Sequence, residues 1–175
     1  METTKNNLPP NIKKFFHNLS DYLDTKLYYF GSVQRSDYVP GKSDIDVDIF
    51  TENEKSIMGK LQHFLHVKKS DFEPIIWIID DKDVTYGYKV KYENPESNLI
   101  AEFSIYNEKF KTVVIKEHNR KIVLPFYITI MLYILKSFYY TIPLLPKKLY
   151  GSCKRFILSI CLGEGYPKFM VLKNI

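Results

Sequence analysis

Two short stretches of the sequence carry residues whose types and spacing suit the chemistry of phosphate groups. The first is Gly31-Ser32, which follows the apolar run of residues 27–30. A Gly-Ser turn between a strand and a helix exposes backbone N–H groups at the start of the helix, and such a turn binds anions readily. Because Gly31 lacks a Cβ, a phosphate can approach the backbone closely, and the Ser32 hydroxyl adds a donor. We therefore expect this turn to hold a phosphate.

The second stretch is an alternation of acidic and apolar residues, Asp44-Ile45-Asp46-Val47-Asp48, separated from the Gly-Ser turn by eleven residues. In a strand, alternate side chains point to opposite faces, so the three aspartates share one face while their neighbours enter the core. Asp44 and Asp46 would lie about 7 Å apart along such a strand. Two bare negative charges repel each other at that distance, whereas two divalent cations about 3.5–4 Å apart bridge them well. Carboxylate oxygens suit Mg²⁺, with Mn²⁺ as the alternative ion.

A phosphate cradle that leads to a strand of metal-binding carboxylates is the arrangement that nucleotidyl transfer requires. The sequence resembles the DNA polymerase β-like nucleotidyltransferase superfamily, whose signature is a hydrophobic residue, Gly-Ser, a gap, and Asp-x-Asp between apolar positions. The residues that carry the resemblance are Phe30-Gly31-Ser32 and Ser43-Asp44-Ile45-Asp46-Val47. It extends in outline from about residue 15 to residue 106. It is closest in kind to the small stand-alone members, such as the minimal nucleotidyltransferases and similar proteins predicted in large DNA viruses and protists.

The resemblance implies a role for each of these residues. Gly31 and Ser32 would hold the triphosphate of a nucleoside triphosphate. Asp44 and Asp46 would ligate two Mg²⁺ ions, and a third carboxylate from a later strand, Glu102, would hold the catalytic ion and help to deprotonate the acceptor. The acceptor hydroxyl would then attack the α-phosphate in line, and pyrophosphate would leave.

Three nearby residues leave alternatives open. Asp48 is a further acid on the same strand face, so the metal pair could be Asp46 and Asp48, although the Ser-Asp-Ile-Asp wording favours Asp44 and Asp46. Arg35 and Lys42 lie between the Gly-Ser turn and the acidic strand. Either cation could neutralise triphosphate charge, and either could equally be a solvated loop residue.

Positioning these residues requires an α+β fold, and the resemblance implies a polymerase β-like core with a small mixed sheet, flanking helices and further C-terminal helices. Apolar periodicity predicts helices over residues 11–26, 54–67 and 108–118. It predicts strands over 27–30, 44–50, 75–79, 86–92 and 99–106, with 75–79 as a central strand. In the last strand, Ala101 and Phe103 share one face and Glu102 the other. We expect a catalytic domain over residues 1–120 and a basic, aromatic-rich helical region over 121–175.

Composition and charge bound the other classes of function. The chain is 45% hydrophobic and 26% charged, which indicates a folded globular protein. Residues 136–175 carry seven basic residues against one acid, which slightly favours a nucleic acid over a protein or a small molecule as the acceptor. We do not expect a membrane span, because one needs about 20 consecutive apolar residues and Lys136 interrupts the apolar stretch. The N-terminus has no secretory signal and the two cysteines form no disulfide framework, so we expect an intracellular location, or the replication site of a large virus.

Two other functions fit parts of the pattern. A catalytically inactive protein with this fold could bind another protein or an RNA. A glycosyltransferase could use Asp-x-Asp to hold a metal ion and a nucleotide sugar, but that hypothesis leaves the Gly31-Ser32 turn unexplained.

Overall fold

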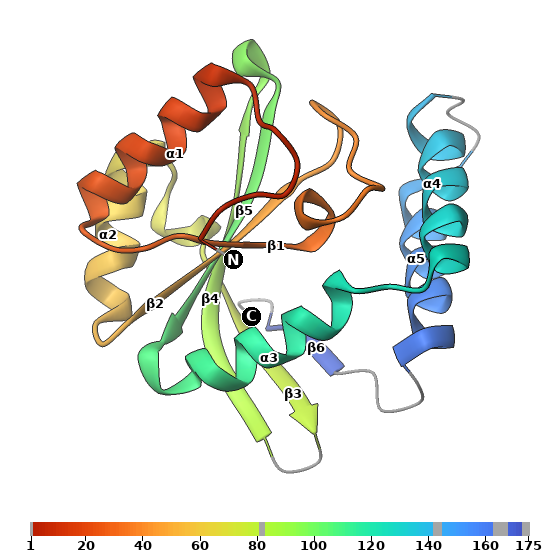
Figure 1. The fold of residues 1–175 in the computed structure, drawn as a ribbon. Helices are drawn as coiled ribbons and strands as arrows, with labels where there is room; N and C mark the ends of the chain where they lie inside the picture. Colours follow the sequence, from red (N-terminus) through yellow and green to blue (C-terminus); the bar gives the residue numbers. More distant parts are fainter. Residues whose placement is uncertain (1, 81–82, 142–144, 163–167, 173–175) are drawn as a thin grey trace.

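The computed structural model describes residues 2–80, 83–141, 145–162 and 168–172, and it contains a six-stranded mixed sheet with helices on both faces (Figure 1). The expected α+β class, with C-terminal helices after the sheet, is confirmed. The helices are α1 (Pro10–Leu23), α2 (Glu54–Leu65), α3 (Lys111–Ile122), α4 (Phe126–Tyr140) and α5 (Lys147–Leu162). The strands are β1 (Tyr28–Phe30), β2 (Ile45–Thr51), β3 (Glu73–Asp80), β4 (Asp83–Asn94), β5 (Leu99–Asn107) and β6 (Lys168–Val171). A short 3₁₀ helix, η1 (Gly31–Gln34), follows β1 directly.

The strand order is β1-β2-β5-β4-β3-β6, with β2 and β5 parallel and every other pair antiparallel. The parallel pair places Asp46 opposite Glu102 in register. Residues 75–79 were expected to form a central strand, and β3 does have strands on both sides, β4 and β6, although it lies second from the edge. Its unbroken apolar run arises because Ile75, Trp77 and the intervening Ile76 serve two faces of the sheet, one of which packs under α3.

Period-two alternation in β2 and β5 divides the molecule into two layers. Val47 and Phe103 belong to a core under α1 and α2, together with helix residues such as Leu19 and Leu61. The opposite face of the sheet carries the acidic residues and also packs against α3, which buries Val114. Figure 1 shows α1 and α2 on one side of the sheet and α3 on the other. The expected parity of both strands is confirmed, and it directs Asp46 and Glu102 away from the main core.

Helix ends follow local sequence chemistry. Pro10 occupies the first turn of α1, where its missing N–H leaves no unpaired donor. The Asn53 side chain caps α2 by accepting a hydrogen bond of 3.0 Å from the Ser56 N–H. Two residues in left-handed conformations, Asp24 and His66, end these helices. The α1–α2 layer is therefore specified largely by its own sequence.

The C-terminal helices α4 and α5 pack on each other beside the end of the sheet that carries η1 (Figure 1). The expectation of a helical region over residues 121–175 missed β6, which pairs antiparallel with β3. This strand is short and is defined by its pairing with β3, so its own sequence gives little periodic signal. The domain division at residue 120 stays a prediction, and β6 is a contact that crosses it.

No single helix among the described residues is long and apolar enough to cross a bilayer. The segments Glu108–Ile122 and Phe126–Tyr140 meet the requirement of length and composition only when taken together, and they are bent by 83° at the break between them.

Gly87 lies on β4 at a point where β4 packs closely against β5, and substituting it tests this packing. A Cβ at this position would lie 2.4 Å from the Ile105 carbonyl oxygen and 2.8 Å from the Tyr106 ring. We predict that Gly87→Ala lowers the free energy of unfolding in urea by about 1–3 kcal/mol, as overpacking does. Gly59→Ala, on α2 where nothing lies within 4 Å of the added atom, should instead raise it by about 0.5–1 kcal/mol. Effects of the same sign for both variants would contradict this packing.

Candidate active site

The Gly31-Ser32 turn and the acidic strand open into one cleft of about 560 Å³. Its floor is the face of the sheet opposite the α1–α2 layer, with contributions from β2, β5 and β4. One side is the turn together with the end of α3, and the other side is α5. Residues far apart in the sequence therefore meet at a single hollow, and the two stretches singled out by their chemistry both contribute to it.

Gly31 and Asp46 lie against each other in this cleft. The antiparallel register of β1 and β2 sets Phe30 opposite Asp46, so the turn that follows β1 bends over the Asp46 side chain. Gly31 has a φ of +70°, and a Cβ built on it would lie 1.9 Å from Asp46 Oδ2. Both the backbone conformation and the lack of space require glycine. The turn consequently brings its backbone next to the carboxylate at the centre of the acidic strand.

Two acidic residues, Asp46 and Glu102, line the floor of the cleft, and the charge of Asp44 acts on Asp46. Asp46 and Glu102 are register partners on β2 and β5, and Asp44 ends the loop directly before β2. Burial raises the pKa of Asp46 well above its usual range, and the negative charges of Asp44 and Glu102 raise it further. Glu102 forms an ion pair with Lys89, with 2.7 Å between Glu102 Oε1 and Lys89 Nζ. The arrangement concentrates negative charge that a cation would stabilise.

The donor set of this acidic group fits Mg²⁺ or Mn²⁺. It offers carboxylate oxygens only, beside a turn whose N–H groups suit phosphate oxygens. Among the described residues, no three His, Cys, Asp or Glu side chains already converge on one point. Mg²⁺ is commonly bound through one or two carboxylates, with waters and substrate phosphates as its remaining ligands. The protein would therefore supply part of the coordination, and a bound triphosphate would complete it.

Asp48 shares the strand face with Asp46 but lies below the cleft floor. It is 1% exposed, and its Oδ2 is 2.9 Å from Nε2 of His118 on α3. The two atoms are close, yet their geometry does not make a hydrogen bond. Burial raises the pKa of Asp48 and lowers that of His118, so both shifts favour the neutral forms. The Phe30 ring stacks on His118 at 3.7 Å and covers the pair. Neither Asp48 nor Asp44 lines the cleft, so the choice of Asp44 and Asp46 as the metal pair stays a prediction.

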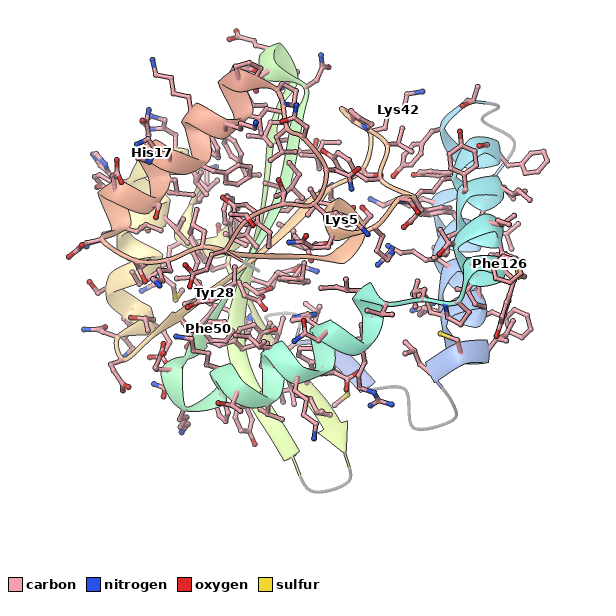
Figure 2. All side chains as sticks on the ribbon, in the orientation of Figure 1. Lys5, His17, Tyr28, Lys42, Phe50 and Phe126 are labelled. Atoms are coloured by element: carbon pink, nitrogen blue, oxygen red, sulfur yellow. The ribbon has the colours of Figure 1, made fainter. Side chains whose placement is uncertain are left out.

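The two loop cations expected near the triphosphate are engaged elsewhere. Arg35 borders the cleft but is 6% exposed, and it donates hydrogen bonds of 2.7 Å and 3.1 Å to the Asp37 carboxylate. Lys42 donates a hydrogen bond of 3.0 Å to the Tyr140 carbonyl oxygen and does not line the cleft. Figure 2 shows Lys42 at the outer end of its loop, beside α4. Phosphate binding by either residue stays a prediction that this arrangement does not favour.

A basic wall on α5 faces the acidic floor, and the sequence analysis did not identify it as part of the site. Its residues follow helical spacing along one face of α5: Lys147, Lys148, Gly151, Lys154, Arg155 and Leu158. The charge of Lys154 opposes the rise in the pKa of Asp46, which places this lysine within electrostatic reach of that acid. The spacing of the cations was a usable signal, but nothing in the local sequence indicates which face of α5 meets the sheet.

Lys121 on α3 is a second cation that the sequence analysis did not select. It lines the cleft, with its ammonium nitrogen 4.5 Å from the centroid of the Trp77 ring. Burial lowers the pKa of Lys121 to about 8, and the nearby carboxylates of Glu117 and Asp48 oppose this shift. The amine is mostly charged at neutral pH and loses its proton in a range where exposed lysines remain charged.

We predict that acylation of Lys121 rises with a midpoint near pH 8, since only the neutral amine reacts and burial lowers the pKa to about 8. Exposed lysines have pKa values near 10.4, so their labelling should rise at higher pH. Brief treatment with acetic anhydride over a pH series, followed by peptide mass spectrometry, measures both profiles. A Lys121 profile that coincides with that of the exposed lysines would show that its amine is hydrated in solution.

Residues 10–124 match the family described as "Nucleotidyltransferase domain". Solved structures with a similar chain course include the Cid1 poly(U) polymerase (13% identity, TM-score 0.38, covering 75% of this chain and 41% of that one). They also include Cid1 with the UTP analogue UMPNPP (14%, 0.37, 75% and 41%) and the polymerase core of TRAMP (13%, 0.41, 92% and 64%). No curated protein sequence matches the chain.

These structural likenesses are distant, and the chain spans 41% of the length of the Cid1 structures. The assignment rests on the family match, which covers more than half of the chain and includes Gly31, Ser32, Asp44, Asp46 and Glu102. The chain belongs to the nucleotidyltransferase domain family.

Proposed function

We propose that this protein transfers a nucleoside monophosphate from a nucleoside triphosphate to an acceptor hydroxyl and releases pyrophosphate. Asp44, Asp46 and Glu102 would hold two Mg²⁺ ions, or Mn²⁺ in their place. The observation that carries the proposal is the contact between Gly31 and Asp46, because it sets an anion-binding turn against a carboxylate within one cleft. An anion and an ionised carboxylate can share that space at low cost when cations lie between them.

The residues of the cleft would have different roles in this reaction. The N–H groups of the turn and the Ser32 hydroxyl would bind oxygens of the triphosphate, with Lys121 and Lys154 as nearby positive charges. Bound Mg²⁺ would supply activation of the acceptor hydroxyl and neutralise charge on the leaving pyrophosphate. Glu102 would hold one ion and orient the acceptor, after its carboxylate exchanges the Lys89 ion pair for the metal. The cleft walls would fix acceptor and α-phosphate in line.

The acceptor that this cleft favours is a nucleic acid. A triphosphate with two divalent cations is close to electrically neutral, so it leaves most of the α5 cations without a partner. Lys147, Lys148 and Arg155 would then be available to the phosphodiesters of a strand entering along α5. The spacing of these cations along one helix face suits a chain of phosphates better than a single small anion.

A second function has one observation in its favour. Glu102 is already paired with Lys89 at 2.7 Å, as it would be in a protein that had lost metal binding and used the cleft only to hold a ligand. Such a protein would bind nucleic acid or another protein without transfer. Metal-dependent transfer that requires Asp46 distinguishes the two functions.

We predict that the protein transfers label from an α-³²P nucleoside triphosphate to nucleic acid in the presence of Mg²⁺ or Mn²⁺. All four nucleotides would be offered with RNA, DNA and protein as acceptors. Asp46→Asn should lower kcat/KM by at least about 100-fold, since even groups that only orient metal ligands are worth about 10–100-fold. Asp21→Asn on α1, an exposed carboxylate that pairs with His17 at 3.6 Å, is the matched control and should transfer normally.

Each other outcome has a definite meaning. Transfer that Asp46→Asn retains, in a variant with an unchanged melting temperature, would rule out the assigned metal site. Label on protein or on a small molecule would contradict a nucleic-acid acceptor, but it would still support nucleotidyl transfer by this protein. Binding of nucleic acid without any transfer by the wild-type protein would favour the inactive alternative.

A further inference from the structure

A buried group of charged residues joins α4 to the loop between the Gly-Ser turn and β2. Lys136 of α4 is 2% exposed. Its ammonium group donates hydrogen bonds to the Asp37 carbonyl oxygen at 2.7 Å and to the Ser43 hydroxyl at 3.2 Å. It also forms an ion pair of 3.0 Å with the Asp37 carboxylate. One side chain therefore contacts two positions of the loop at the same time.

Arg35 completes the group from the other end of the loop. Its guanidinium binds both oxygens of the Asp37 carboxylate, which is fully buried, and reaches the Lys121 carbonyl oxygen at 3.4 Å. Arg35 follows η1 directly, and Ser43 directly precedes Asp44. The buried group thus holds the loop at its exit from the phosphate turn and at its entry to the acidic strand.

The chemistry of Lys136 is unusual for its position. It is the one charged residue of α4, a helix of fifteen residues, and it lies one turn after the buried Leu132 on the same face. Burying an ammonium group is expensive unless it is fully paired, and an apolar residue of similar size often stabilises a protein as well or better. A buried lysine here is better explained by the geometry that it imposes than by stability.

We propose that Lys136 is a positioning residue of the active site, which fixes the loop of residues 35–44 and thereby sets Asp44 relative to the Gly31-Ser32 turn. The inference rests on the proposed metal-dependent transfer for its catalytic consequence. Lys136 lies beyond residues 10–124, the part of the chain that matches the family. By this inference, helix α4 helps to position the catalytic residues, although it lies outside the region shared with the family.

The test compares Lys136→Met with Leu132→Ala. The first removes the ammonium group and keeps the length of the side chain. The second destabilises the same face of α4 by creating a cavity in its contact with α5, and Leu132 does not line the cleft. Both variants would be studied well below their melting temperatures. Ser43→Ala, which removes one acceptor of Lys136, provides a milder variant if Lys136→Met does not fold.

Two readouts separate positioning from stability. Amide hydrogen exchange over residues 35–44 should accelerate in Lys136→Met and stay unchanged in Leu132→Ala. The affinity for Mn²⁺ in the presence of a non-hydrolysable ATP analogue, measured by electron paramagnetic resonance, should fall about 10–100-fold in Lys136→Met only. Ser43→Ala should shift both quantities in the same direction by less.

The outcomes distinguish this inference from the proposed function. Unchanged loop exchange in Lys136→Met and in Ser43→Ala would overturn the positioning role, whatever the protein catalyses. Faster exchange with unchanged Mn²⁺ affinity would overturn its connection to the site. Failure of the wild-type protein to bind Mn²⁺ would contradict the proposed function, while the exchange comparison would still decide whether Lys136 orders the loop.

Discussion

The Asp46 carboxylate occupies the space in which a side chain at position 31 would begin, at 1.9 Å from the position of the missing Cβ. The antiparallel pairing of β1 with β2 imposes this contact, since it sets Phe30 opposite Asp46. Glycine is required there both for room and for a φ of +70°. The same contact places anion-binding N–H groups beside a carboxylate, and in the proposed function cations would screen a bound phosphate from that carboxylate. The contact between the backbone of residue 31 and the Asp46 side chain thus requires glycine at this position.

In the rest of the cleft, negative and positive charges lie on different elements. The sheet contributes carboxylates from the parallel strands β2 and β5, and the helices contribute cations, chiefly from α5. Negative charge on the floor suits metal ions, while positive charge on the wall suits phosphates, so a substrate that carries both finds complementary surfaces. This division makes the C-terminal helix α5 part of the cleft. It also gives a physical reason for the basic composition of the last forty residues, which in the sequence was only a charge imbalance.

Those parts of the site that depend on local sequence were predictable. Alternation with a period of two placed Asp46 and Glu102 on one face of their strands, because that periodicity is a property of a single extended segment. Contacts between distant segments were not predictable in this way. Lys136 and Asp37 are 99 residues apart, and no local pattern indicates that Arg35 binds Asp37 in the interior. The pairing of β6 with β3 and the orientation of α5 likewise depend on tertiary packing, so the basic wall remained an unplaced excess of charge.

In the proposed site, metal ions and a triphosphate bind between Asp46 and Gly31. The most direct test is a crystal structure with Mn²⁺ and a non-hydrolysable nucleoside triphosphate, with diffraction recorded near the manganese absorption edge. The account predicts anomalous peaks at coordination distance, about 2.0–2.2 Å, from the Asp46 carboxylate, with triphosphate oxygens over the N–H groups of the turn. Manganese bound away from Asp46, or a triphosphate held elsewhere than at Gly31, would contradict it.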